Sequence, residues 1–506
     1  MNGRAAKRDP KHKAKLAKRR LKRELLSAQI WAKNTYAKAD LPDARLNKRL
    51  VQSAATLAGK PHDSIPQASA DTAEAKAMYR LIENKKVTMP HFLTPAAKAT
   101  ARRCAGEPVV LAVQDTTGMT FAKANTIKEL GPIASEPCTT RGIYLHSTIA
   151  LREDGMALGL FDLYTWARKS KDDKDEANEE HEANESEVKV ESESEKKKKQ
   201  TIEDKESWKW IAGIRAAHAA IDELPEDHRP QLSHIGDREK DVYEVLVQID
   251  ELGDSGVIRC NQNRRVELPD GTITSAYEAL RSQPVLYRKT LAVPRKKGQR
   301  KRKATVEIRR CAVRVHPPHD RPKGSPAVDV NLVEVWEPNP PEGVERLHWR
   351  LWTFEPVETI AEVERVVQFY CFRWRVEDYH QVLKSGCRIE EVQFETLPRI
   401  LKILALYAPI ALRILQLRDW ARREPRAPCT VVLSKLEWKT LWTAIHDKPP
   451  PASQKPPSLR QAALWIGRLG GHLNRKGDGM PGVQTLWQGW RDLILMTRVY
   501  SALADP

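Results

Sequence analysis

The sequence predicts an α/β protein in which a central region containing a sheet lies between two helical regions. Short apolar runs such as PVVLAVQD (108–115) and QLSHIGD (231–237) are typical of strands, and each ends in an aspartate. The regions before and after them space their apolar residues as helices do. With 506 residues, the chain is long enough for several domains and a sizeable core.

The N-terminal part divides into two segments. Residues 1–28 are basic and rich in Ala and Lys, and we expect a disordered extension that is either a backbone-binding arm or a solvated tail. Residues 29–98 place Leu46, Leu50 and Ala54 on one helix face, which predicts a small helical domain. Such a domain on a basic protein can bind DNA, although helices alone do not establish this.

Residues 105–395 form the predicted central domain. Within it, residues 168–200 are charged and of low complexity, and we expect a mobile surface insertion there. Residues 260–350 or so alternate apolar and polar positions and predict a β-rich insertion. Further strands are predicted at 143–151, 157–164 and 257–259, and a helix at 205–221. Residues 396–506 are expected to be helical, with a Pro-rich loop at 447–457.

Charge and composition restrict the function. The net charge of +18 favours a polyanionic partner, above all nucleic acid, with a role in solubility alone as the alternative. No stretch approaches about 18 consecutive apolar residues, so no membrane span is expected. The N-terminus lacks the apolar segment of a signal peptide, which predicts an intracellular protein. Seven dispersed cysteines without a CxxC pair argue against a disulfide framework and a zinc site.

The segment YCFRWRVEDYHQVLK (370–384) carries the most information about chemistry. It follows an apolar run with helical spacing, so we expect one helix with Tyr370, Arg373, Glu377 and Lys384 on a single face. A carboxylate can hold a divalent metal, whereas Arg and Lys bind phosphate oxygens. The face therefore suggests metal-dependent chemistry on a nucleic-acid backbone.

Glu377 needs partners, and two aspartates are candidates. Asp115 and Asp237 each end a predicted strand, and open α/β sheets place reactive groups at the carboxyl ends of strands. A helix packed on that edge could bring Glu377 beside both. Three convergent carboxylates need cations, which favours two Mg²⁺ ions that activate a water or a 3′-hydroxyl. The alternative is that each aspartate only caps a strand end.

Three motifs resemble the DDE transposases of the insertion-sequence-four family, and most closely those of the transposon-five type. They are QDTTG (114–118), GDREKDVYEVL (236–246) and Y-x2-R-x3-E-x6-K (370–384). The likeness extends from about Trp31 to the C-terminus. Flanking matches are YRLIEN (79–84), DKESWKW (204–210), TFEPVE (353–358), IGRLGG (466–471) and LWQGW (486–490).

The resemblance implies an RNase H-like core with Asp115, Asp237 and Glu377 as the catalytic, metal-binding triad. It implies Mg²⁺ as the cofactor, with Mn²⁺ able to substitute. Tyr370, Arg373 and Lys384 match the family's signature helix, whose lysine contacts DNA phosphates near the cleaved end.

Three further residues are candidates for contact with DNA. Arg259 matches a phosphate-contacting arginine, and Trp349 matches the tryptophan that receives a flipped base when the element's end forms a hairpin; the alternative for Trp349 is a strand core residue. Trp374 either packs in the core or wedges near the distorted end.

The N-terminal domain departs from the family pattern, so the DNA end sequence that it recognises cannot be transferred. Its basic residues Arg45, Lys48 and Arg49 are candidates for DNA contact or belong to a solvated helix face.

By this resemblance, residues 29–98 bind the transposon's inverted-repeat ends and residues 396–506 pair two subunits into a homodimer in the synaptic complex. The expected activity is cut-and-paste transposition: hydrolytic nicking, a hairpin intermediate, and joining of the 3′-hydroxyl to target DNA. Alternatives are an RNase H-like endonuclease without strand transfer and a non-catalytic DNA-binding inhibitor of transposition. The resemblance also implies a cytoplasmic, nucleoid-associated bacterial protein.

Overall fold

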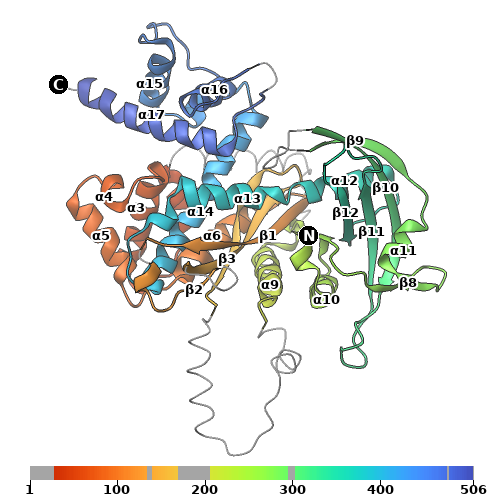
Figure 1. The fold of residues 1–506 in the computed structure, drawn as a ribbon. Coiled ribbons are helices and arrows are strands. Elements are labelled where there is room, and N and C mark those ends of the chain that lie inside the picture. Colours follow the sequence, from red (N-terminus) through yellow and green to blue (C-terminus); the bar gives the residue numbers. More distant parts are fainter. Residues whose placement is uncertain are drawn as a thin grey trace, which may run out of the picture.

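A 12-stranded mixed sheet runs through the centre of the molecule, with helical regions from both ends of the chain packed on its side (Figure 1). The computed structural model describes residues 28–122, 124–133, 140–168, 205–293, 302–475 and 478–504. The expected N-terminal extension lies outside these residues except for Ala28, as does the expected insertion except for Arg168. The predicted α/β class with a helical region on either side is confirmed.

The N-terminal helices form a compact bundle. Asp43 caps α3 by accepting a hydrogen bond from the backbone N–H of Arg45 (2.7 Å), and Asp71 caps α5 by accepting one from Glu74 (2.7 Å). Leu50 is fully buried in this bundle. The helices are α2 (Ala28–Tyr36), α3 (Ala44–Gly59), α4 (Ile65–Ala68), α5 (Thr72–Glu83) and α6 (Pro90–Cys104).

Five strands make the half of the sheet that carries the aspartates. In spatial order they run β4, β3, β1, β5 and β6; β3 is antiparallel to β1 and to β4, while β5 is parallel to β1 and to β6. Their bounds are β1 (Val109–Thr120), β3 (Arg141–Arg152), β4 (Ala157–Trp166), β5 (Gln231–Gly236) and β6 (Ser255–Arg259). The short β2 (Gly131–Pro132) pairs with the edge of β3.

The predicted β-rich insertion continues the same sheet rather than forming a separate one. Its strand β12 (His348–Thr353) pairs antiparallel with β6 and joins the two halves. Along β10 (Arg302–Val315), Val306, Ile308, Val313 and Val315 are buried, as their alternation predicts. The other strands are β7 (Arg265–Glu267), β8 (Ile273–Ser275), β9 (Tyr287–Val293) and β11 (Val328–Trp336).

Helices cover both faces of the sheet, and β1 divides its side chains between them. Val110 and Ala112 pack in a core with α6 (Pro90–Cys104) and α9 (Trp208–Asp222), whereas Leu111 and Val113 pack in the core that contains α12. The second face is covered by α12 (Ile360–Cys371), α13 (Trp374–Gln381) and α14 (Leu397–Arg423). Two more helices lie beside β6 to β11, namely α10 (Tyr243–Glu251) and α11 (Ala276–Arg281).

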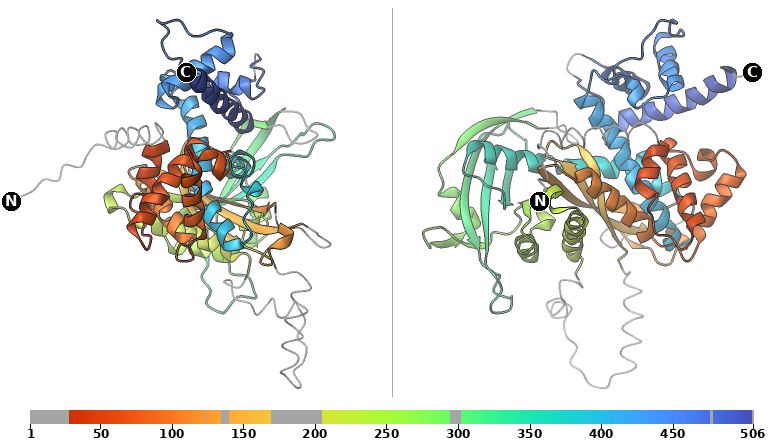
Figure 2. Two further views of the ribbon diagram at one scale, coloured as in Figure 1. Left: turned by 90° about the vertical axis from the view of Figure 1, so that its left-hand side faces the viewer. Right: turned by 180° about the vertical axis from the view of Figure 1, so that it is seen from behind.

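The last helices form a small group above α14, as Figures 1 and 2 show. They are α15 (Lys435–His446), α16 (Leu459–Leu469) and α17 (Val483–Ala504). By length and hydropathy α14 would suffice for a membrane span, but 88% of its most apolar window is buried inside the structure. A helix that is surrounded by protein on all sides is also apolar, because it too is shielded from water. We therefore assign α14 to the core.

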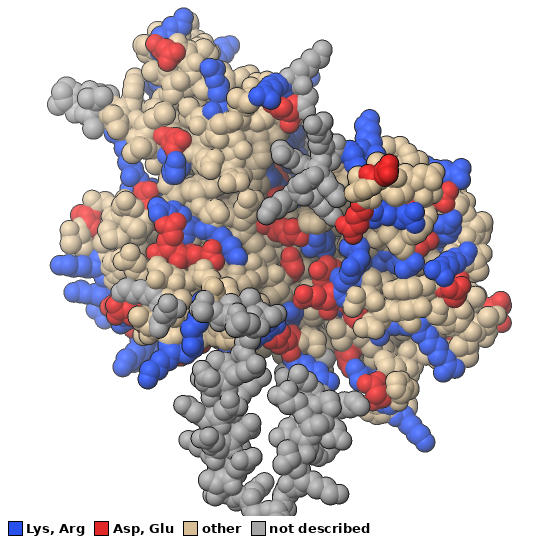
Figure 3. Space-filling model, in the orientation of Figure 1, with Lys and Arg blue, Asp and Glu red and all other residues tan. Residues whose placement is uncertain are grey.

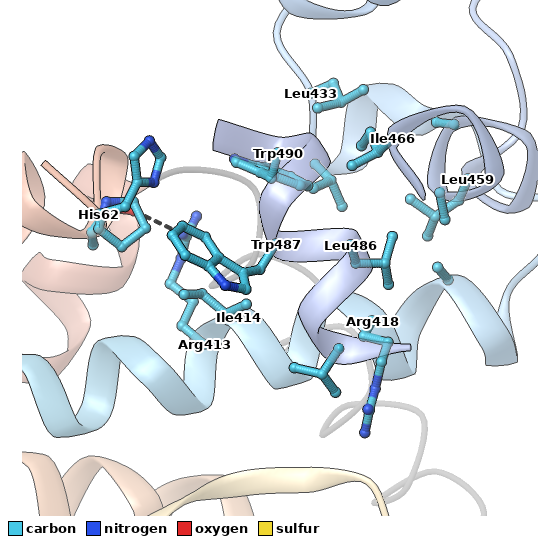
Figure 4. Close-up of a pocket in the computed structure, with 17 residues that line it drawn as sticks. His62, Arg413, Ile414, Arg418, Leu433, Leu459, Ile466, Leu486, Trp487 and Trp490 are labelled. Carbon is cyan, nitrogen blue, oxygen red and sulfur yellow. Dashed lines mark hydrogen bonds between the residues drawn. The ribbon is translucent and has the colours of Figure 1, made fainter. Parts of the chain in front are cut away.

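The C-terminal helices meet the N-terminal bundle at a largely apolar cavity of about 60 Å³ (Figure 4). The ring of His62 lies 5.4 Å from that of Trp487, and Arg413 donates a hydrogen bond to the carbonyl of Ala58 (3.1 Å). No carboxylate lines this cavity. The predicted acidic site is therefore elsewhere.

Candidate active site

Asp115 and Asp237 lie at the same level on two neighbouring parallel strands. The register pairs Val113 of β1 with Ile235 of β5, and two residues further along each strand stand Asp115 and Asp237. Asp237 directly follows β5 and accepts a hydrogen bond from the backbone N–H of Glu239 (3.0 Å), which begins the short helical turn η3 (Arg238–Lys240). The two predicted aspartates thus meet at one edge of the parallel pair.

The expectation that β1 ends at Asp115 is wrong. The strand continues to Thr120, because β3 keeps pairing with it after β5 has stopped: Asp115 faces Ser147 and Thr120 faces Gly142. Only the parallel pairing ends before Asp115, at Val113. Asp115 therefore sits on a strand that is held on one side only.

The expected single helix across residues 370–384 is also wrong. Helix α12 ends at Cys371, α13 begins at Trp374, and a π-helical turn, η4, spans Val382–Gly386. At the break, the ring of Phe372 packs over Gly155 in the turn between β3 and β4, where a Cβ atom would lie 2.5 Å from Cε1 of Phe372. Tyr370 consequently lies on α12, Arg373 in the break between the helices, Glu377 on α13 and Lys384 in η4.

The guanidinium of Arg373 bridges two of the carboxylates. It donates to Oε1 of Glu377 at 2.6 Å and lies 3.7 Å from Oδ2 of Asp115, and only 6% of the residue is exposed. Helix α13 is held on this face by a second contact, since Nε2 of His380 lies 3.1 Å from Oγ of Ser147. The break between the helices therefore still leaves Glu377 on the face of Asp115.

The protonation of Asp115 reflects these neighbours. Its pKa is raised to about 7, mainly by burial and to a smaller extent by the negative charges of Asp237 and Glu377, while Arg373 and the backbone N–H of Thr116 oppose the increase. For Arg373, burial lowers the pKa, but the charges of Glu377 and Tyr370 outweigh it. The structure thus places Asp237 and Glu377 close enough to Asp115 to affect its pKa, with Arg373 between Asp115 and Glu377.

We tested whether these side chains fit a divalent metal. Among the described residues, no three His, Cys, Asp or Glu side chains are arranged as a finished metal site, since Arg373 stands between Asp115 and Glu377. The donors themselves are carboxylate oxygens, which Mg²⁺ and Mn²⁺ prefer. Burial, the main cause of the raised pKa of Asp115, disfavours its charged form, and a bound cation would favour that form. The chemistry of Asp115, Asp237 and Glu377 therefore suits a divalent cation, while in this structure Arg373 lies between two of them.

A tyrosine, a tryptophan and an arginine form a group beside the carboxylates. Trp349 on β12 is half-buried, and its ring meets that of Tyr370 edge to face at 5.0 Å. Burial raises the pKa of Tyr370, and the neighbouring positive charges of Arg259 and Arg373 lower it by a smaller amount. Arg259 also donates to the carbonyl of His348 (3.1 Å). Trp349, Tyr370 and Arg259, which are grouped as candidate DNA contacts only by the family resemblance, therefore lie next to one another.

Lys384 and Trp374 make other contacts. Lys384 donates to the backbone carbonyl of Gly118 in the extended part of β1 and lies 3.9 Å from a carboxylate oxygen of Glu390. Trp374 is 44% exposed, and the guanidinium carbon of Arg373 lies 4.3 Å from its ring centroid. The core alternative for Trp374 is wrong.

The N-terminal candidates are not brought to the carboxylates. Arg45, Lys48 and Arg49 lie on α3, on the far side of α14 from the β-rich half (Figures 1 and 2). Arg45 is exposed and pairs with Asp43 at 2.9 Å, Lys48 is exposed, and Arg49 is half-buried. Figure 3 shows acidic side chains gathered in the middle of the molecule, with basic ones on the β-rich half beside them.

Sequence reasoning missed two buried polar residues behind the aspartates. Gln114 and Lys240 belong to the motifs that contain Asp115 and Asp237, and both are completely buried. The pattern DREK resembles a solvated turn, so it contains no signal that its lysine is buried. Only the adjacency of both residues to the motif aspartates could have drawn attention to them.

Three family models match the chain. A transposase DNA-binding model matches residues 28–87, a transposase DDE domain model matches 191–410, and a transposase Tn5 dimerisation domain model matches 409–502. The DDE match contains Asp237 and Glu377, while Asp115 lies before it. The chain thus matches transposase DNA-binding, DDE and dimerisation domains in this order, which supports a Tn5-like DDE transposase, and the DDE domain implies an RNase H-like fold.

Proposed function

We propose that this transposase works by cut and paste, with Asp115, Asp237 and Glu377 as its catalytic triad. The observation that carries the proposal is the register of β1 with β5, which sets the two aspartates side by side, together with the approach of Glu377 on α13. A strand-end cap would need no third carboxylate, whereas a phosphoryl-transfer site needs several oxygen donors at one point.

The three carboxylates would hold Mg²⁺, with Mn²⁺ as a substitute. Bound there, the metal would lower the pKa of an attacking water or 3′-hydroxyl and stabilise the charge on the leaving oxygen. Arg373 holds Glu377 in this structure, and with Glu377 on a metal its guanidinium would be free to bind a phosphate oxygen.

The reaction would consist of consecutive in-line displacements at phosphorus. Water attacks at the element's end, a P–O bond breaks, and a 3′-hydroxyl is released. That hydroxyl attacks the opposite strand to give a hairpin, which water reopens, and the new 3′-hydroxyl attacks target DNA. Trp349, next to Tyr370, would stack the base that the hairpin displaces, while Arg259 and Lys384 would bind nearby phosphates.

The flanking domains would supply the contacts with DNA and with a second subunit. The N-terminal domain would bind the inverted-repeat ends, with Arg45, Lys48 and Arg49 as candidate contacts. Two subunits would pair through the C-terminal helices in the synaptic complex. Membership of the insertion-sequence-four family and a cytoplasmic, nucleoid-associated location in a bacterium belong to the same proposal.

The test uses the DNA that flanks this chain's own gene. Purified protein is incubated with labelled flanking DNA and supercoiled target in Mg²⁺, and nicked, hairpin and joined products are separated. We expect all three products, and we expect Asp115→Ala, Asp237→Ala and Glu377→Ala to abolish each of them while DNA binding persists. Cleavage that survives in Asp115→Ala would refute the triad.

The product pattern also separates the alternatives. Nicked DNA without joined product would favour an RNase H-like nuclease that lacks strand transfer. Binding without any cleavage would favour a DNA-binding inhibitor of transposition. A linear double-strand break without a hairpin would be consistent with a transposase but would refute the hairpin step.

A further inference from the structure

Lys240 is a fully buried lysine three residues after Asp237. Its ammonium group donates to Oε1 of Gln114 and lies 5.9 Å from the ring centroid of Trp210. No carboxylate of the described residues forms an ion pair with it. The negative charge of Asp237 raises the pKa of Lys240, against the stronger lowering effect of burial. A lysine buried in this way is costly, so a role is expected for it.

Gln114 connects the lysine to the rest of the sheet. Its amide nitrogen donates to the carbonyl of Trp210 on α9 (3.2 Å) and to Oγ1 of Thr148 on β3 (3.3 Å). Its amide oxygen accepts from Lys240 on η3. One side chain therefore joins β1, β3, α9 and the turn that carries Asp237.

Two glycines leave room for this pair. A Cβ atom on Gly236 would collide with the aliphatic part of Lys240, and one on Gly213 would collide with the amide of Gln114 and with Thr148. Both glycines have negative φ and therefore are not required for backbone conformation. Their lack of a side chain is explained by the space that Lys240 and Gln114 occupy.

The pair lies on the face of the sheet opposite to Glu377. Gln114 precedes Asp115 on β1, and successive side chains of a strand point to opposite faces. The Asp115 face holds α13, through His380 and Ser147, whereas the Gln114 face holds α9. Lys240 and Gln114 therefore connect β1 to η3 on the face of the sheet opposite to Glu377. These are the two segments that carry Asp115 and Asp237.

We propose that Lys240 and Gln114 form a positioning pair that keeps Asp237 level with Asp115 and so sets the affinity of the carboxylates for divalent metal. The proposal rests on the metal-binding role given to the triad above. The need for such a device follows from the strand pairing, since the hydrogen bonds between β1 and β5 stop at Val113 and Ile235, two residues before the aspartates. Beyond that point Lys240 supplies the link.

The sign of the effect on metal binding distinguishes positioning from simple electrostatics. Removing a positive charge near a metal site strengthens metal binding if charge alone matters. Removing a residue that orients the ligands weakens it, typically 10- to 100-fold for groups behind the ligands. The two explanations predict opposite changes for the same substitution.

The experiment measures Mn²⁺ binding to the full-length, DNA-free protein by isothermal titration calorimetry. Lys240→Met keeps the length of the side chain and removes its charge and hydrogen bond. We expect Lys240→Met and Gln114→Leu each to weaken Mn²⁺ binding about tenfold. We expect the double variant to bind no worse than either single variant, because the two residues act as one unit.

Two controls accompany these variants. Lys209→Met removes another buried lysine of the same region, which pairs with Glu239 at 3.4 Å and makes no hydrogen bond to Gln114, and it should leave Mn²⁺ binding unchanged. Asp115→Ala should abolish binding. If Asp115→Ala binds Mn²⁺ as the wild type does, the metal assignment itself is wrong.

Melting temperatures show whether each variant folds. If Lys240→Met does not fold, Gln114→Leu carries the test alone. Folded variants that bind Mn²⁺ as tightly as the wild type, or more tightly, would overturn the positioning role while leaving the triad intact, provided that Asp115→Ala has lost binding.

Discussion

Arg373 and Glu377 form an ion pair one helical turn apart, with 2.6 Å between the buried guanidinium and the partly exposed carboxylate. The same guanidinium lies 3.7 Å from Asp115. A cation supplied by the chain itself thus occupies the position between two carboxylates that a divalent metal would require. On the function proposed above, Glu377 would have to leave Arg373 before the carboxylates could share a metal.

Replacing Arg373 should therefore separate metal binding from catalysis. We expect Arg373→Gln to bind Mg²⁺ more tightly above pH 7, because a competing positive charge is gone, and yet to cleave DNA about 100-fold more slowly, because Glu377 is no longer oriented. Calorimetry and a nicking assay measure the two effects. Arg365→Gln on α12, whose guanidinium pairs with Glu153 at 2.8 Å, is the control and should change neither.

Asp115 should make the metal-free protein less stable as the pH rises. Its pKa of about 7 in the folded protein lies above the ordinary value of 3.8, so the folded state holds its proton more tightly and this contribution is lost between pH 4 and pH 7. The difference corresponds to at most about 4 kcal/mol. Asp115→Asn should remove this loss, as seen in thermal melts with EDTA.

The same melts test metal removal. At pH 8 Mg²⁺ should stabilise the wild type more than at pH 5, because only the ionised carboxylates bind it. Burial also raises the pKa of Asp162, to about 6, so only the difference between wild type and Asp115→Asn reports on Asp115. Equal pH dependence in both proteins would contradict the burial of a titrating Asp115.

Trp349 should matter for the hairpin step and not for the first nick. We expect Trp349→Ala to slow hairpin formation about 5- to 150-fold, which corresponds to the loss of roughly 1–3 kcal/mol of base stacking, with the initial nick unchanged. A time course on labelled ends separates the two products. Trp336→Ala on the adjacent β11, where the ring meets His348 at 4.6 Å, is the matched control. Equal slowing of both steps would indicate a packing role for Trp349.

Gly155 should be required for the break between α12 and α13. Its φ of +81° is unfavourable for other residues, and an added Cβ atom would meet the ring of Phe372. We expect Gly155→Ala to destabilise the protein by about 2–4 kcal/mol in denaturant unfolding. Gly253→Ala, at φ +64° with nothing within 4 Å, should cost only about 1–2 kcal/mol. Equal losses would show that Phe372 accommodates the methyl group.

Much of the architecture was determined locally, and the sequence therefore predicted it. The strands at β1, β3, β4 and β5, the alternation along β10 and the C-terminal helices all follow from hydrophobic spacing, which reports which side of an element is buried. The position of Asp237 after β5 was visible for the same reason. Motif order then related three distant segments to a transposase.

Tertiary structure decided what depends on partners far away in the sequence. β1 extends past Asp115 only because β3 pairs with it, and the helix at 370–384 breaks where Phe372 meets Gly155, more than 200 residues away. The same holds for Lys240, whose buried ammonium group has its hydrogen-bond partner in Gln114, 126 residues earlier in the chain. Hydrophobic spacing records one element at a time, whereas the bridge from Arg373 to Asp115 exists only once the sheet and its helices have packed.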